Sequence, residues 1–215
     1  MQPWSYSHLD KFETCPKQFY HVKVAKDIVE PPTMHTDWGH TVHSAVEARV
    51  RDGTPLPDGM TQWESIVGQI AALPGEMHAE VKLAVDSAFQ PADWDTAWSR
   101  GIIDLMILTE TQAAVIDWKT GKYKPSEQIA LYVAYVFAHF PQVMEVSGMY
   151  VWLKERKLSI SKYKRSDVAA IWQDMLPRIA RLEGAYEQGQ WPPKPSGLCN
   201  GWCPVRSCQF WKEKR

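Results

Sequence analysis

Three charged residues of this 215-residue chain combine types and spacing that could perform chemistry: Asp104, Asp117 and Lys119. Asp104 interrupts an apolar run, and the other two close the next apolar run. A buried carboxylate without a partner is costly, so acids in apolar strands are expected to have one, and a divalent cation can serve. Asp117 and Lys119 are two positions apart and would point to the same side of a strand. We therefore expect two carboxylates and one ammonium to meet at one place.

A hairpin would bring these residues together. The apolar stretches Gly101–Leu108 and Ala113–Trp118 flank the polar segment Thr109–Gln112, which is a pattern typical of two antiparallel strands and their turn.

This combination suits metal-assisted hydrolysis of a phosphodiester. Mg²⁺ prefers oxygen ligands and is usually held by one or two carboxylates, water and substrate phosphate. The metal activates water and neutralises charge on the phosphate, while the lysine can orient the water or stabilise that charge. The alternative is an ordinary surface pair at a strand end, because the tripeptide D-x-K is common.

Further motifs extend the pattern on both sides. They are Gly39–His43 (GHTVH), Gly101–Asp104 (GIID), Asp117–Lys122 (DWKTGK) and Gln128–Tyr132 (QIALY). With them, the chain from Ser5 to Trp211 resembles the RecB-type branch of the PD-(D/E)xK nucleases, including its iron–sulfur CRISPR-adaptation and phage exonucleases. The resemblance implies an α/β (mixed α+β) fold with a restriction-endonuclease-like core, a central mixed sheet flanked by helices, in a single domain over residues 1–215.

The resemblance also assigns roles in the site. It implies that Asp104, Asp117, His43 and the backbone carbonyl of Trp118 bind Mg²⁺ or Mn²⁺. An imidazole beside carboxylates would favour Mn²⁺. Glu80 occupies the position where relatives often carry another acidic catalytic residue. Taken alone, His43 would be a core histidine and Glu80 a solvent-facing strand residue.

Residues on other elements are candidates for contacting DNA. A helix is expected over residues 125–140, and its Gln128 and Tyr132 match the Q-x-x-x-Y motif through which the family is thought to contact DNA and order the site. Without the resemblance they would be helix surface.

A second expected hairpin, Val146–Leu153 with Leu158–Lys164, is rich in basic residues. Its turn carries the DNA-binding candidates Lys154, Arg156 and Lys157. Trp152 and Tyr163 could stack on bases. The alternative is a charged edge hairpin that resists aggregation.

The remaining pattern predicts the supporting elements. An N-terminal helix begins near Trp4 with Ser5 or Ser7 as its N-cap. Apolar spacing predicts three further helices and one strand. These are Asp37–Arg51, Thr61–Leu73 and Asp167–Gln188 as helices, and Glu80–Val85 as the strand.

The four cysteines of the chain are divided between its ends. Cys199, Cys203 and Cys208 form C-x₃-C-x₄-C, and Cys15 is the fourth. Four thiolates suit a [4Fe–4S] cluster or a structural Zn²⁺ site. The resemblance favours the iron–sulfur cluster, which would join the N- and C-terminal segments. The spacing differs from the more usual C-x₂-C-x₅-C, so zinc and free thiols stay open.

Composition adds limits. With 45% hydrophobic and 23% charged residues the chain is ordinary for a globular protein. A net charge of −1 argues mildly against a nucleic-acid binder, although local patches matter more than the sum. No apolar run is long enough for a membrane span and no signal peptide is evident, so we expect a cytoplasmic protein of a bacterial cell or phage-infected host.

Together these observations predict a metal-dependent DNA exonuclease acting on single strands or duplex ends in recombination, repair or phage DNA processing. Recombination or replication proteins are candidate partners. Two alternatives remain: a flap or structure-specific endonuclease, and a non-catalytic DNA-binding or adaptor protein on the same scaffold.

Overall fold

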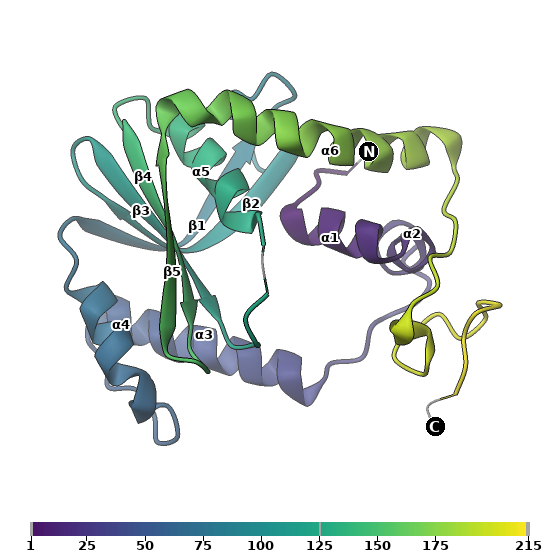
Figure 1. Ribbon diagram of the computed structural model, residues 1–215, viewed down its shortest axis with the longest axis horizontal. Helices are drawn as coiled ribbons and strands as arrows, with labels where there is room; N and C mark the ends of the chain where they lie inside the picture. The colour runs from purple at the N-terminus through teal and green to yellow at the C-terminus, as the bar shows by residue number, and fades with distance from the viewer. Residues whose placement is uncertain (1, 125, 214–215) are drawn as a thin grey trace. The chain divides into compact units, whose positions relative to one another are not determined.

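The computed structural model describes residues 2–124 and 126–213 (Figure 1). The chain divides into two compact units, Thr33–Trp172 and the combination of Met1–Pro32 with Gln173–Arg215. The expectation of one nuclease domain over the whole chain stays a prediction.

The unit Thr33–Trp172 is built on a five-stranded sheet in the order β1-β2-β3-β4-β5. Its strands β3 and β4 are parallel, and the other neighbours are antiparallel. The predicted mixed sheet is therefore confirmed, and so is the hairpin of β2 with β3. The strands are β1 Glu76–Val85, β2 Ser99–Leu108, β3 Gln112–Lys119, β4 Glu145–Trp152 and β5 Lys157–Lys164.

Helices α3 (Met34–Asp52) and α4 (Glu64–Ala71, preceded by a 3₁₀ turn at Thr61–Trp63) pack against one face of this sheet. Helix α3 begins at a capping box on Thr33 and ends at Gly53, whose φ of 71° suits glycine. The shared core joins buried apolar side chains of both helices and three strands: Val42, Val46, Ile66, Val67, Ile70, Leu105, Ile107, Ile116, Trp118, Val151 and Leu153.

Helix α5 (Gln128–His139) connects β3 to β4 and covers the other face. A Cβ at Gly101 of β2 would lie 2.6 Å from the Tyr132 ring, so the helix approaches the sheet closely there. The helix was expected over residues 125–140. Its predicted first residue, Pro125, lies outside the described residues, and the end at His139 agrees within one position.

The regular alternation of side chains is interrupted in β2 beside Asp104. Ser99 and Gly101 contact α5, whereas Leu105 and Ile107 belong to the core with α3 and α4. Residues 101 and 105 would point to the same face of the sheet in a regular strand. The direction of the side chains must therefore reverse between these two positions. The neighbouring position on β1, Glu80, has a positive φ of 51°, which is unusual for a residue other than glycine.

The hairpin of β4 with β5 forms one edge of the sheet. Trp152 is only 3% exposed, and its Nε1 donates to Ser159 Oγ at 3.0 Å. The expectation that Trp152 could stack on bases is therefore wrong. Arg165, the basic residue directly after β5, donates to the backbone carbonyls of Phe137, Phe140 and Val143 and ties the end of α5 to the sheet. Positive charge alone did not reveal which side chains turn inward.

The second unit contains helices α1 (Tyr6–Thr14), α2 (Pro16–Phe19) and most of α6 (Val168–Gln188), with a π-helical turn at Tyr20–Val24 and a 3₁₀ turn at Gly197–Cys199. The 3₁₀ turn at Arg165–Asp167, just before α6, belongs to the unit Thr33–Trp172. Ser5 caps α1 by accepting from His8 N, as one of the two expected caps.

Apolar rings and one ion-pair network hold this unit. Phe12 and Phe19 contact Trp191. Glu13 accepts from Arg178 Nη2 at 2.6 Å and from Arg181 Nη2 at 3.0 Å, which fastens α1 to α6.

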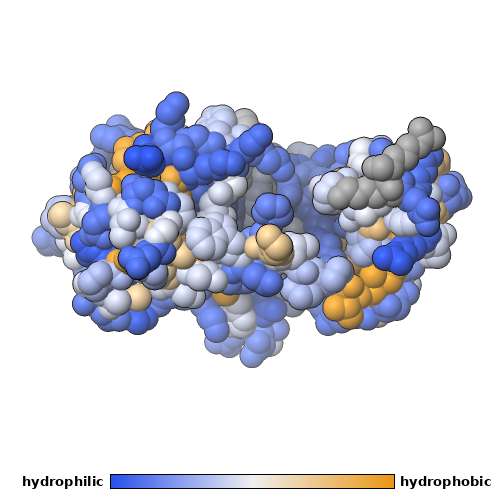
Figure 2. Space-filling view, turned by 90° about the horizontal axis from the view of Figure 1, so that it is seen from below, coloured by the Kyte–Doolittle hydropathy of each residue, from blue (hydrophilic) through white to orange (hydrophobic). Residues whose placement is uncertain are grey.

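No helix in the described part of the chain is long and apolar enough to cross a bilayer. Hydrophilic residues cover most of the face seen in Figure 2, and hydrophobic ones occupy separate smaller areas.

Candidate active site

The candidate site lies where β2 and β3 separate. Their last paired positions toward the site are Leu105 and Ile116, so Asp104 and Asp117 come opposite each other just beyond the ladder. Asp104 replaces the missing backbone acceptor, because its Oδ2 accepts from Trp118 N at 2.9 Å. The break in the ladder therefore leaves two carboxylates face to face.

Asp117 and Lys119 point to one side of β3, as their spacing predicts. Lys119 Nζ lies 2.7 Å from Asp117 Oδ2, and the two side chains are 28% and 4% exposed. Among the described residues, Asp117 Oδ2 receives no well-directed hydrogen bond besides this close ion pair. A buried carboxylate oxygen is thus left with free coordination capacity.

Helix α5 positions the ammonium group of Lys119. Lys119 Nζ donates to Gln128 Oε1 at 2.9 Å, and Gln128 Nε2 donates to the Tyr132 hydroxyl at 2.7 Å. Tyr132 is 6% exposed. This arrangement places the Q-x-x-x-Y pair beside the catalytic candidates, where Tyr132 orients Gln128 and Gln128 orients the ammonium.

Tyr150 of β4 is a site residue that the sequence did not indicate. Its ring lies 5.5 Å from Lys119 Nζ, its hydroxyl accepts from Ile129 N at 3.1 Å, and it donates to Ser126 O at 3.2 Å. It therefore fixes the first turn of α5, which carries Gln128. Tyr150 comes to the site through its parallel pairing with Asp117. This contact joins segments that are far apart in the sequence, so local sequence patterns do not predict it.

His43 and Glu80 border the carboxylates. His43 Nδ1 lies 3.5 Å from Asp104 Oδ2. Burial lowers the pKa of His43, against the opposing attraction of Asp117. Glu80 is exposed and comes opposite Asp104 between the pairs Ala79–Leu105 and Val81–Ile103.

The carboxylates of Asp104 and Asp117 repel each other in a site with little access to solvent. Burial, followed by the charge of Asp117, raises the pKa of Asp104 to about 8. Burial also raises the pKa of Asp117, although the Lys119 ammonium lowers it. Without a cation, the two acids therefore retain a proton near neutral pH.

The donor set fits a hard divalent cation. Two carboxylates, that of Asp117 buried and that of Asp104 17% exposed, and a neighbouring imidazole supply the ligands that Mg²⁺ or Mn²⁺ accepts. Within residues 2–124 and 126–213, no three His, Cys, Asp or Glu side chains already stand in a metal-holding arrangement. The candidate ligands therefore lie near one another, but their donor atoms do not surround a single position. The role of the Trp118 backbone carbonyl as a further ligand stays a prediction.

The basic candidates Lys154, Arg156 and Lys157 are exposed around the turn between β4 and β5. They are not part of the cluster of Asp104, Asp117 and Lys119, although the turn begins directly after Leu153, whose N–H donates to Lys119 O at 3.0 Å.

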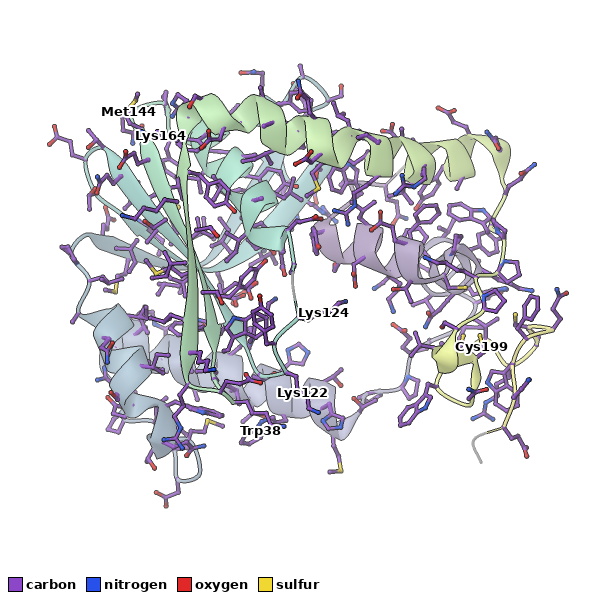
Figure 3. The ribbon with its side chains drawn as sticks, viewed as in Figure 1. Trp38, Lys122, Lys124, Met144, Lys164 and Cys199 are labelled. Atoms are coloured by element: carbon purple, nitrogen blue, oxygen red, sulfur yellow. The ribbon has the colours of Figure 1, made fainter. Side chains whose placement is uncertain are left out.

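The four cysteines come together in the other unit. All four line one cavity of about 20 Å³. Two of their sulfurs face backbone donors: Lys194 N lies 3.4 Å from Cys15 Sγ, and Ser196 N lies 3.5 Å from Cys199 Sγ. Burial raises the pKa of Cys203, and the charges of the other three thiols add to the rise. Figure 3 shows Cys199 in the C-terminal tail of the ribbon. The set has the chemistry of a Cys₄ centre, although it too is not preassembled for a metal in the part of the chain described.

Comparison with solved structures gives distant matches. A crystal structure named "Putative exonuclease" from Eubacterium rectale is 12% identical, with a TM-score of 0.51, and the match covers 93% of this chain and 86% of that one. The crystal structure of SSO0001 is 14% identical with a TM-score of 0.42, covering 94% and 84%. At these identities the first match concerns the fold alone. No curated protein sequence matches the chain significantly.

A family model is decisive where single relatives are not. The model of the PD-(D/E)XK nuclease superfamily matches residues 3–208, which is nearly the whole chain. Nucleases of this superfamily typically use Mg²⁺ or Mn²⁺. The mixed sheet flanked by helices agrees with the core of this group. The chain belongs to the PD-(D/E)XK nuclease superfamily.

Proposed function

We propose that this protein is a divalent-metal-dependent DNA exonuclease of the RecB-like branch. The observation that carries the proposal is that Asp104 and the buried Asp117 lie opposite each other on β2 and β3, with Lys119 Nζ only 2.7 Å from Asp117. Placing two acids opposite each other with little solvent costs stability unless a cation binds between them. Such an arrangement is expected in a catalytic protein and has no evident value in a purely structural one.

Each residue has a distinct task in this proposal. Asp104, Asp117 and His43 would hold Mg²⁺ or Mn²⁺, with Glu80 at the edge. When bound, the cation supplies an acidified water and neutralises charge on the phosphate. Lys119 orients the attacking water or stabilises the phosphate, because Gln128 fixes its ammonium at 2.9 Å.

DNA is the proposed substrate, as single strands or duplex ends. The exposed basic turn of Lys154, Arg156 and Lys157 would contact phosphates and contribute affinity without sequence preference. The biological setting we propose is recombination, repair or phage DNA processing in the cytoplasm, with recombination or replication proteins as partners.

A structure-specific endonuclease would use the same chemistry and differs only in where the strand is cut. A non-catalytic adaptor would not need the retained triad of Asp104, Asp117 and Lys119. The geometry therefore favours an enzyme over an adaptor.

Product analysis tests the proposal. DNA labelled at the 5′ or 3′ end, single- or double-stranded, is incubated with Mg²⁺, Mn²⁺ or EDTA. Mononucleotides or short products released progressively from one end support an exonuclease, and internal cuts support the endonuclease. Glu110→Ala, in the exposed turn of the same hairpin, serves as the matched control for Asp117→Ala. Absence of metal-dependent cleavage in the wild type, with DNA binding retained, would instead support the adaptor.

We also propose that Cys15, Cys199, Cys203 and Cys208 hold a structural [4Fe–4S] cluster, with Zn²⁺ as the alternative. The shared cavity and the N–H donors near two sulfurs support a thiolate-bound centre. Protein purified without oxygen would be brown with an iron–sulfur cluster, and colourless with about one zinc per chain otherwise.

A further inference from the structure

The segment between β3 and α5 presents an aromatic side chain that none of the roles above uses. Tyr123 is 61% exposed. Its neighbours Lys122 and Lys124 are exposed as well, and Figure 3 shows both on this connection. The segment starts after Lys119 and ends before Gln128, so it is anchored at both ends by residues of the candidate site.

A row of rings connects Tyr123 to the catalytic lysine. The Tyr123 ring lies 5.0 Å from Trp152, and Trp152 lies 5.5 Å from Tyr150. The Tyr150 ring in turn lies 5.5 Å from Lys119 Nζ. Because Trp152 and Tyr150 are buried, the exposed ring rests on a rigid support close to the reacting position.

Such a ring suits one kind of ligand. A supported, solvent-exposed aromatic face can stack on a nucleobase, and this contact tolerates any sequence. A flanking ammonium group can contact a neighbouring phosphate. An interior base pair offers no free face, so stacking within the strand requires a base that is out of its duplex.

We propose that Tyr123 stacks on an unpaired base of the DNA strand near the scissile phosphate, while Lys122 contacts the backbone. This inference rests on the proposed nuclease function and sharpens it: the strand in the site is single-stranded, either throughout or at a frayed end. The competing explanation is that Tyr123 only shields Trp152 from water.

The test couples the protein side chain to a single base. Single-stranded oligonucleotides carry one abasic residue at successive distances from the cleaved bond, and kcat/KM is measured for wild type and Tyr123→Ala. At one position the abasic residue should lower wild-type kcat/KM about 5- to 100-fold, the range expected for one stacked base. The same residue should have almost no effect on Tyr123→Ala, because the partner ring is already gone.

Two variants control the measurement. Tyr123→Phe keeps the ring and should retain the positional penalty. Met144→Ala removes a similarly exposed side chain, 54% exposed, at the other end of β4 and should behave as wild type. A melting temperature close to that of the wild type is expected for Tyr123→Ala, since the residue is exposed.

The outcomes separate the two proposals. If the wild type cleaves DNA but every abasic penalty is the same in Tyr123→Ala, the stacking inference is wrong and the nuclease function stands. If blunt duplex is cleaved as fast as single strands, without any position-specific penalty, the inference is also wrong. If the wild type cleaves no DNA, the proposed function itself fails, and the inference falls with it.

Discussion

The Asp104–Asp117 centre and the four-cysteine cavity are both candidate metal sites, but they are made in opposite ways. The carboxylates lie on adjacent strands of one hairpin and are close in the sequence. The cysteines come from opposite ends of the chain and meet only in the folded unit. The first centre concentrates like charges in a buried place, and the second surrounds half-buried thiols with backbone donors. The contrast suggests that the first is poised for chemistry and the second for holding the chain ends together.

The largest difference between the two centres is expected when the ammonium group of Lys119 is removed. We expect Lys119→Ala to lower kcat by at least about 100-fold, by analogy with loss of one charge-stabilising group in other active sites. DNA binding, measured by fluorescence anisotropy in EDTA, should change little. Asp117→Ala and Asp104→Asn should behave similarly, because neither substitution preserves the charge that holds a cation. Wild-type cleavage by purified Lys119→Ala would refute the catalytic assignment.

Substituting a cysteine should act on stability instead. Cys15 and Cys199 enclose a loop of about 180 residues, and cross-linking a loop of that length is worth about 5 kcal/mol in the loop-closure model, borrowed here from disulfides. Each Cys→Ser variant should lose bound metal and melt at least about 5 °C lower. Residual activity should follow the folded fraction. Four freely titrating thiols in native protein without iron or zinc would end the cluster hypothesis.

Charge reversal at Lys154, Arg156 and Lys157 separates binding from both centres. Losing three phosphate contacts should flatten the slope of log affinity against log salt by about 2 to 3. Melting temperature and metal content should be unchanged, because all three side chains are exposed. An unaltered slope would show that the turn is only charged surface.

The pH dependence of stability should distinguish the centres in metal-free protein. The pKa of Asp104 is raised from its ordinary value to about 8, so the folded state binds more protons than the unfolded state between about pH 4 and 8. The free energy of unfolding should therefore fall as pH rises through this window. Asp104→Asn should weaken this fall, and chemical denaturation in EDTA at a series of pH values measures it. A variant with the same pH dependence as wild type would contradict the assigned pKa.

The smallest effect is expected at Tyr150. Tyr150→Phe keeps the ring beside Lys119 but loses two hydrogen bonds to the start of α5. Since one such bond contributes about 0.5–1.5 kcal/mol, we expect kcat to fall about 3- to 10-fold with KM nearly constant. Tyr150→Leu should be worse because the ring is lost too. Equal activity of Tyr150→Phe and wild type would restrict Tyr150 to a packing role.

The local parts of this molecule could be predicted from sequence. The hairpin of β2 with β3 and the shared side of Asp117 and Lys119 follow from alternation and turn signals, and the structure has both. The ends of the helices were correct within a few positions. These features depend on neighbours in the sequence, which patterns describe well.

Other features depend on contacts between distant segments. The role of Tyr150 needs the parallel pairing of β4 with β3, and the burial of Trp152 needs the packing of the second hairpin. Leu176 of α6 is apolar but 41% exposed, so its residue type alone does not give its burial. The reversal of side-chain alternation beside Asp104 is invisible to a periodic pattern, because it is the place where the period fails.

The connectivity of the sheet also bears on how the protein folds. Strands β1, β2 and β3 are consecutive antiparallel neighbours joined by residues 86–98 and 109–111, and β4 and β5 are joined by residues 153–156, so these pieces need only local loop closures. The parallel pairing of β3 with β4 must wait until α5 has crossed between them. We therefore expect Asp104 and Asp117 to be neighbours early, in a nascent meander. Tyr150 should join them only in the late step in which β4 pairs with β3. Mutations in β4 should therefore affect a later step of folding than mutations in β2.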